Sequence, residues 1–287
     1  MSNNNNNNNI SLTYKLGGET EINRLGYGGM QLTGPGVWGD TPNRDLAVRL
    51  LHSAVESGTN FFDTADAYGP NTNEVLYHDA LHAYYDNIVV ATKGGLERSG
   101  PNQWHINGDP EYIASTIEGS LKRLQLDQMT LWQLHRVDPR VPIEETLAPV
   151  ADALKSGKIK YVGLSEVDVK TIERARKVVP VVSVQNLYNL VERSWEPVLD
   201  YTIEQNLAFI PWYPLASGPG KMQQNIQAIA EKHGATTAQV ALAWLLRRSA
   251  NILLIPGTRS LAHLQENMAA VQVKLTDEEF SLLSKSF

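Results

Sequence analysis

Short apolar runs alternate with longer amphipathic stretches along most of the chain. The runs are rich in β-branched and aromatic residues, as is typical of buried strands, and the stretches between them repeat with the period of a helix. The runs predicted to be strands are residues 24–30, 60–64, 88–92, 129–134, 161–164, 182–185, 208–212 and 253–255. Such an alternation indicates parallel βαβ units.

Several residues mark where the intervening helices begin. Asp109 followed by Pro110 is typical of an N-cap with proline in the first turn, and Thr41 precedes the first helix. An extra helix is expected at 236–248, and a last helix at 276–285 opens with Thr276 and Glu279 in a capping box. The remaining helices are predicted to begin near residues 43, 73, 110, 143, 168, 192, 225 and 261.

The order of these elements predicts the fold class. Strands that alternate with helices in this number fit an α/β protein, a (β/α)8 TIM barrel with extra C-terminal helices. Residues 12–16 and 20–23 flank Gly17-Gly18 and predict an N-terminal β-hairpin. A doubly wound sheet is the alternative, but its glycine-rich first turn is missing because Gly34-Pro35-Gly36 interrupts the chain before any helix.

Length and composition bear on domain organisation. The chain has 287 residues and no linker rich in proline, glycine or serine, so we expect residues 10–287 to form a single domain. Residues 3–9 are all asparagine, which predicts a disordered tail at residues 1–9. This start lacks the features of a signal peptide, and with the absence of cysteine it favours a cytoplasmic location.

Composition also excludes several classes of function. The net charge is -6 and no block of lysine and arginine indicates a nucleic-acid partner. No apolar run approaches the roughly 18 residues of a membrane span. Without cysteine, and without a paired His and carboxylate spacing, we predict no metal site. The expected partner is a small molecule, bound by a monomer or a weak homo-oligomer.

Polar residues follow three neighbouring predicted strands. Asp63 and Tyr68 follow the second strand, Lys93 the third and His135 the fourth. Taken singly, each of these residues could have a purely structural role, as a helix cap, a loop residue or a residue at the rim of the barrel. In a barrel, however, the C-terminal ends of the strands meet at one mouth. We therefore expect these four side chains to converge there.

Such a set can move a proton to a carbonyl oxygen. A free tyrosine titrates near pH ~10, and a neighbouring ammonium group favours the phenolate and lowers this pKa. A carboxylate keeps the ammonium charged, and a histidine can orient the substrate oxygen. General acid catalysis of this kind contributes roughly 10²–10⁴ in rate. It supplies no hydride, so a cofactor is required.

Six segments resemble the aldo-keto reductase family, and the resemblance covers the chain from about residue 12 to its end. The segments are FDTADAYG at 62–69, ATK at 91–93, LH at 134–135, GLS at 163–165, VQNLYN at 184–189 and IPGTRS at 255–260 with Glu266 and Asn267. The resemblance implies an NADP(H)-dependent oxidoreductase that reduces an aldehyde or ketone, with Tyr68 as proton donor. Lys93 and Asp63 would tune its pKa, and His135 would orient the carbonyl.

The resemblance also implies which residues bind the cofactor. Ser165 and Gln185 would bind the nicotinamide amide, Trp212 would stack on its ring, and Leu215 and Ser217 would contact the pyrophosphate. The other implied cofactor residues are Gly29, Met30, Asp63, Tyr213, Gly257, Thr258, Arg259, Ser260, His263, Glu266 and Asn267.

Two positions depart from the family pattern. Glu166 stands where the family usually has asparagine, and His263 where it often has arginine. Arg259, Ser260 and the start of the following helix still offer donors for a phosphate, so NADP(H) is favoured over NAD(H).

Segments 23–36 and 251–258 further resemble bacterial pyridoxal reductase-like members. Pyridoxal or another small cyclic carbonyl compound is therefore a plausible substrate. A regulatory cofactor-binding protein of the same fold is the main alternative, and an aldolase or isomerase that uses Lys93 as a Schiff base is another.

Overall fold

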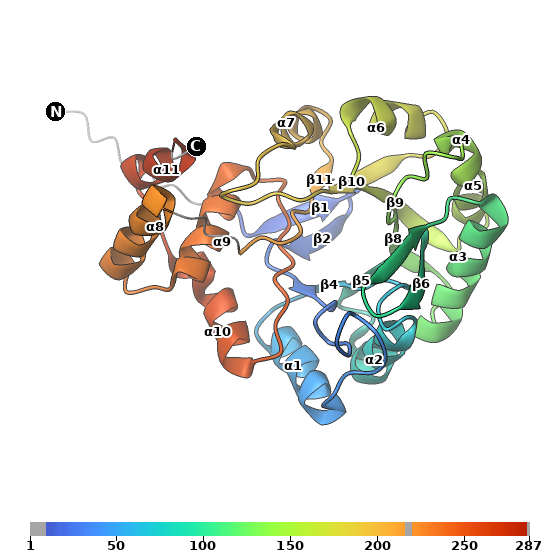
Figure 1. The fold of residues 1–287 in the computed structure, drawn as a ribbon, viewed down its shortest axis with the longest axis horizontal. Coiled ribbons are helices and arrows are strands. Elements are labelled where there is room, and N and C mark those ends of the chain that lie inside the picture. Colours follow the sequence, from blue (N-terminus) through green and yellow to red (C-terminus); the bar gives the residue numbers. More distant parts are fainter. Residues whose placement is uncertain (1–9, 216–219, 286–287) are drawn as a thin grey trace.

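The parallel strands form one curved sheet in which spatial order follows chain order (Figure 1). The computed structural model describes residues 10–215 and 220–285. The order is β11-β10-β9-β8-β5-β4-β3, which never reverses and so excludes a doubly wound sheet. The strands are β3 (Tyr27–Gly28), β4 (Phe61–Asp63), β5 (Val89–Gly94), β8 (Met129–Leu134), β9 (Ile159–Ser165), β10 (Val181–Gln185) and β11 (Ala208–Phe209).

The two edges of this sheet meet through the segment predicted to be the eighth strand. Leu254 bridges to Leu25 beside β3, and Ile252 bridges to Phe209 in β11. This closure confirms the (β/α)8 barrel. The eighth strand itself was predicted wrongly as a full strand at 253–255, since only single bridges form there. Pro211 and Pro256, which have no N–H, limit the ladder on this side.

The predicted N-terminal hairpin is confirmed and closes one end of the barrel. It pairs β1 (Thr13–Leu16) with β2 (Thr20–Asn23) in antiparallel register. Leu16 and Ile22 are fully buried in a cluster with Leu131 and Leu253 of the barrel. This end of the barrel is filled with apolar side chains, and the cavity described below opens at the other end.

Helices cover the outside of the barrel (Figure 1). Asp109 caps α3 and Pro110 is its first residue, as predicted. Asn43, rather than Thr41, caps α1. These helices are α1 (Arg44–Glu56), α2 (Thr72–Leu81), α3 (Pro110–Leu124), α4 (Ile143–Thr146), α5 (Ala148–Lys155), α6 (Val169–Ala175), α7 (Glu196–Glu204), α8 (Gly220–His233) and α10 (Leu261–Ala269), with short 3-10 turns η1 (His82–Tyr84) and η2 (Ala270–Gln272).

Two helix starts were predicted several residues away from their true positions. α7 begins at Glu196 and not near residue 192, because Pro197 falls in its first turn, where proline is favoured. α8 begins at Gly220 and not near residue 225.

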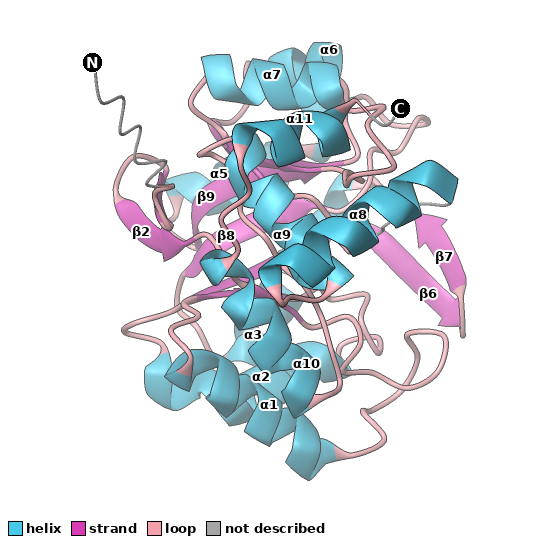
Figure 2. Cartoon of the chain, turned by 90° about the vertical axis from the view of Figure 1, so that its left-hand side faces the viewer, coloured by secondary structure: helices cyan, strands magenta, loops and turns pink. Residues whose placement is uncertain are grey.

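The extra helices are α9 (Thr237–Arg248) and α11 (Asp277–Ser284), which lie with α8 on one side of the barrel (Figure 2). Both open with a capping box, formed by Thr276 and Glu279 in α11 as predicted. A second hairpin, β6 (Leu96–Gly100) with β7 (Gln103–Ile106), lies between β5 and α3, where no strand was predicted. The predicted disordered tail at 1–9 lies outside the described residues, and a single domain at 10–287 stays a prediction.

One buried arginine ties the barrel closure to the hairpin and to α9. Arg24 is 1% exposed, and its guanidinium donates to the backbone carbonyls of Ser11, Leu246, Ser249 and Ile252. Its own carbonyl accepts from the N–H of Leu254, in the eighth strand segment. The guanidinium therefore satisfies carbonyls that no strand partner reaches.

We expect Arg24→Met to lower the free energy of unfolding by about 3 kcal/mol, because several buried carbonyls lose a charged donor together. Arg44→Met is the matched control, since Arg44 forms an exposed ion pair with Asp79, which is worth about 0–1 kcal/mol. Urea unfolding of the full chain measures both. Equal losses in the two variants would contradict this role of Arg24.

Candidate active site

A cavity of about 530 Å³ opens at the C-terminal ends of the barrel strands. Its volume lies within the usual range for small-molecule sites. The structure brings most of the sequence-predicted residues to its walls. Those that line it are Met30, Asp63, Tyr68, His135, Ser165, Gln185, Trp212, Tyr213, Leu215 and Gly257.

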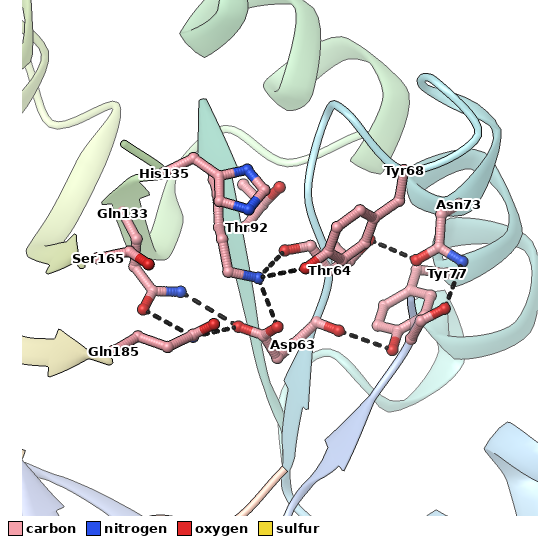
Figure 3. A network of polar contacts seen from close by, with 12 residues as sticks. Asp63, Thr64, Tyr68, Asn73, Tyr77, Thr92, Gln133, His135, Ser165 and Gln185 are labelled. Atoms are coloured by element: carbon pink, nitrogen blue, oxygen red, sulfur yellow. Dashed lines mark hydrogen bonds and ion pairs between the residues drawn. The ribbon is translucent and has the colours of Figure 1, made fainter. Parts of the chain in front are cut away.

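A buried ion pair lies at the base of this cavity (Figure 3). The Lys93 side chain is fully buried, and its Nζ donates to Asp63 Oδ2 over 2.5 Å and to the Thr64 carbonyl over 2.9 Å. Its third hydrogen bond, over 3.2 Å, goes to the hydroxyl oxygen of Tyr68. The ammonium group therefore joins the carboxylate to the phenol.

The second oxygen of Asp63 is also satisfied. Asp63 Oδ1 accepts from Gln133 Nε2 over 3.2 Å and from Gln185 Nε2 over 3.1 Å. The carbonyl of Asp63 accepts from the hydroxyl of Tyr77 in α2. Strands β4, β5, β8 and β10 thus each contribute a side chain to one network (Figure 3).

A tight turn holds Tyr68 over the ion pair. The N–H of Tyr68 donates to the Ala65 carbonyl, and the Tyr68 carbonyl accepts from the N–H of Asn73. Gly69 follows with φ +102, and a Cβ there would lie 1.9 Å from Thr72 Oγ1. Only glycine fits this position, so the turn directs the phenol ring into the cavity.

Burial, rather than the ammonium group, dominates the titration of Tyr68. Desolvation raises the pKa of Tyr68 more than the adjacent Lys93 lowers it, so the pKa is raised above its usual value. Lys93 lowers the pKa of Tyr68 as expected, but Asp63 raises it, and the expected net lowering is wrong because the sequence does not reveal how deeply the phenol is buried. For Lys93, burial lowers the pKa, but Asp63 and Tyr68 outweigh it and the net shift is upward. Lys93 stays charged, which argues against a Schiff-base nucleophile.

His135 is held neutral beside Tyr68. Burial, followed by the charges of Lys93, Arg136 and Arg98, lowers the pKa of His135 well below its usual value. Its ring lies edge-on to Tyr68 with centroids 5.8 Å apart. A neutral imidazole in this position can form a hydrogen bond to a substrate oxygen near the phenol.

The residues predicted to bind a cofactor fall into two groups. Ser165, Gln185 and Trp212 lie on the cavity wall together with Tyr213, Leu215, Met30 and Gly257. Thr258, Arg259, Ser260, His263, Glu266 and Asn267 lie at α10, where Ser260 caps the helix. Gly29 lies beside the cavity residue Gly28, and a Cβ on Gly29 would clash with the hydroxyl of Tyr77. Ser217 lies outside the described residues.

Comparison with protein families then identifies the chain. Residues 24–286 match the aldo/keto reductase family. The chain belongs to the aldo/keto reductase family. The aldo/keto reductase fold and the sequence-based resemblance are thereby confirmed, and the protein is an oxidoreductase.

Relatives of this aldo/keto reductase extend over almost its whole length. It is 44% identical to an uncharacterised oxidoreductase of Schizosaccharomyces pombe over 93% of this chain and 88% of that protein. It is 38% identical to pyridoxine 4-dehydrogenase of Escherichia coli, over 95% of this chain and 97% of that one.

Solved structures are similar as well. A thermostable aldo-keto reductase in complex with the inhibitor epalrestat has a TM-score of 0.85 and 29% identity, over 96% of this chain and 99% of that one. An aldo-keto reductase from Klebsiella pneumoniae in complex with NADPH has a TM-score of 0.80 and 25% identity, over 96% and 95%.

Sequence reasoning did not assign Arg136 and Trp104 to the aldo/keto reductase cavity, or Gln133 to the polar network around Asp63. Arg136 lines the wall and donates to Ser165 Oγ over 3.1 Å. Arg136 could have been predicted from the sequence, because it directly follows His135 at the end of a predicted strand. Trp104 also lines the cavity, and its ring centroid is 6.5 Å from that of His135. Gln133 gave no signal, because a glutamine inside a strand has no special sequence context.

Two features of the structure bear on metal-binding and membrane-spanning functions. Within residues 10–215 and 220–285, no group of three or more His, Asp or Glu side chains could hold a metal ion. In the same part of the chain, no helix is both long and apolar enough to cross a membrane.

Proposed function

We propose that this protein reduces an aldehyde or ketone to an alcohol with NADP(H), and that Tyr68 donates the proton. The observation that carries the proposal is the hydrogen bond from Lys93 Nζ to the Tyr68 hydroxyl, at the base of a cavity that also contains His135. A phenol, a charged ammonium group and a neutral imidazole are the groups that a carbonyl oxygen needs as it becomes an alkoxide.

The cavity residues fit a nicotinamide cofactor. Ser165 and Gln185 present polar groups on one side, and the indole of Trp212 offers an aromatic face. Gly28 and Gly257 lie so close together that a Cβ on Gly257 would be 2.7 Å from the Gly28 carbonyl oxygen. Because neither residue has a side chain, the backbone at this part of the wall stays accessible to a cofactor. When bound, NADPH would supply the hydride. The NADPH complex of the Klebsiella pneumoniae relative supports this cofactor.

The residues of this chain would carry the proton. Tyr68 gives its hydroxyl proton to the substrate oxygen, and the adjacent Lys93 ammonium stabilises the resulting phenolate. Asp63 keeps Lys93 charged and in place. His135 orients the carbonyl by a hydrogen bond from the cavity wall. Leu96 and Trp104 form an apolar part of that wall, which limits access of water to the reacting oxygen.

The substrate is proposed to be pyridoxal or another small cyclic carbonyl compound. The similarity to pyridoxine 4-dehydrogenase of Escherichia coli supports this class. The aromatic and aliphatic wall formed by Trp104, Leu96 and Ile106 suits a flat ring.

The central experiment follows NADPH oxidation with pyridoxal, nitrobenzaldehyde and cyclic ketones. We expect turnover by the wild-type protein and a loss of about 10²–10⁴ in kcat for Tyr68→Phe, because the proton donor is removed. NADPH binding should stay close to that of the wild type.

Tyr84→Phe is the control, since Tyr84 is only half-buried and does not line the cavity. Tight NADPH binding without turnover of any substrate would overturn the proposed enzymatic function and favour a regulatory cofactor-binding protein. An active Tyr68→Phe variant would overturn the assignment of the proton donor.

The pKa directions predict a flat pH profile for carbonyl reduction. Tyr68 donates a proton only below its pKa, which is raised above the ordinary value of about 10. His135 is neutral above its pKa, which is lowered well below the usual value. The kcat/KM for reduction should therefore stay level from about pH 6 to about pH 9 and fall only above about pH 10. A fall in kcat/KM with an apparent pKa near 7 would contradict the role of Tyr68 if it occurs as the pH rises. It would contradict the role of His135 if it occurs as the pH is lowered.

The choice of NADP(H) over NAD(H) is proposed to depend on Arg259. This residue is exposed beside the N-terminus of α10 and forms no ion pair within the described part of the chain. An always-charged guanidinium can bind a phosphate group strongly. Arg259→Ala should weaken NADPH binding about tenfold or more and change NADH binding little. Calorimetric titration measures both, and equal effects would show that Arg259 does not recognise the phosphate.

A further inference from the structure

A carboxylate lies next to the cavity, where it contacts the cavity residue Trp212. Glu166 directly follows β9, and its backbone adopts φ +54, a left-handed conformation that residues other than glycine rarely adopt. Its N–H donates to the Gln185 carbonyl over 3.1 Å, which fixes the residue against β10. Such a constrained backbone marks a residue whose side-chain direction matters.

The side chain of Glu166 holds Trp212. Its Oε1 accepts from the indole Nε1 of Trp212 over 2.6 Å and from the N–H of Leu187 over 2.6 Å. Leu187 and Trp212 also form a β-bridge with each other. Hydrogen bonds to a charged acceptor are roughly twice as strong as neutral ones. One oxygen therefore fixes the indole at its N–H edge and the backbone beside it.

A cation lies near the same indole. The guanidinium of Arg136 is 5.9 Å from the centroid of the Trp212 ring and donates to Ser165 Oγ and the His135 carbonyl. It forms no ion pair with Glu166 within 4.0 Å. The two charges are therefore not joined in an ion pair, and Arg136 itself lines the cavity.

We propose that Glu166 is a positioning residue that fixes the indole of Trp212, and that its negative charge favours binding of the oxidised nicotinamide over the reduced one. The oxidised ring is cationic and the reduced ring is neutral, so a nearby carboxylate stabilises only the oxidised form. Arg136 opposes this preference. The inference rests on the proposed function, in which the cofactor is NADP(H).

The first test compares dissociation constants of NADP+ and NADPH for the full chain by calorimetric titration. Glu166→Gln keeps an oxygen acceptor for both N–H groups and removes the charge. It should weaken NADP+ binding about tenfold while NADPH binding changes little. Glu166→Ala should weaken both by about tenfold or more, because the indole also loses its acceptor. Glu173→Gln is the matched control, on the exposed side of α6.

The second test asks whether Glu166 acts through Trp212. Trp212→Phe keeps an aromatic ring but removes the N–H. If Glu166 fixes the indole, Glu166→Ala should weaken NADPH binding much less in the Trp212→Phe background than in the wild type. Equal effects in both backgrounds would overturn the positioning role.

The outcomes separate this inference from the proposed function. If the wild-type protein binds neither NADP+ nor NADPH, both the proposed function and the role of Glu166 are overturned. A wild-type protein that binds NADPH, with the same NADP+ to NADPH affinity ratio in Glu166→Gln, overturns the charge effect alone. Circular dichroism of each variant identifies misfolding. If Glu166→Ala misfolds, the nearly isosteric Glu166→Gln variant still tests the charge effect.

Discussion

The ion pair between Lys93 and Asp63 is the constraint on which the rest of the site depends. Moving two charges from water into a protein interior costs several kcal/mol for each ion, unless their remaining hydrogen-bonding capacity is filled. Here every partner comes from the barrel. Gln133 and Gln185 satisfy the free oxygen of Asp63, and the ammonium group uses its last donor on Tyr68. The phenol is therefore placed by the same interactions that make the buried charges tolerable.

This requirement explains why the barrel must keep its register. Lys93 pairs with Gln133 across β5 and β8, and Asp63 pairs with Ala91 across β4 and β5. A shift of one residue in any of these strands would turn its polar side chain out of the barrel. The apolar base formed by the N-terminal hairpin then excludes water from below. The polar network lies at the opposite end of the barrel, where the cavity opens.

The fold and the main site could be predicted from sequence because both follow local patterns. Strand ends carry the polar residues, so Lys93 and His135 were found from their positions alone. Quantities that depend on packing could not be predicted. The sign of the Tyr68 pKa shift depends on how burial compares with the nearby charge. The closure through Arg24 and the bond from Trp212 to Glu166 join residues far apart in sequence, and no local pattern signals them.

The cavity wall that would face the proposed substrate is built differently from the ion pair, and we expect substrate specificity to depend on it. The β6–β7 hairpin carries Trp104, whose ring stacks on the guanidinium of Arg98 at 3.6 Å. Arg98 also donates to the carbonyls of Val37 and Ala67, so the hairpin is tied to the turn that holds Tyr68. A change at Arg98 would therefore alter this wall and the position of Tyr68 together. Because no strand ladder joins the hairpin to the barrel, its apolar side chains can vary without disturbing the buried ion pair.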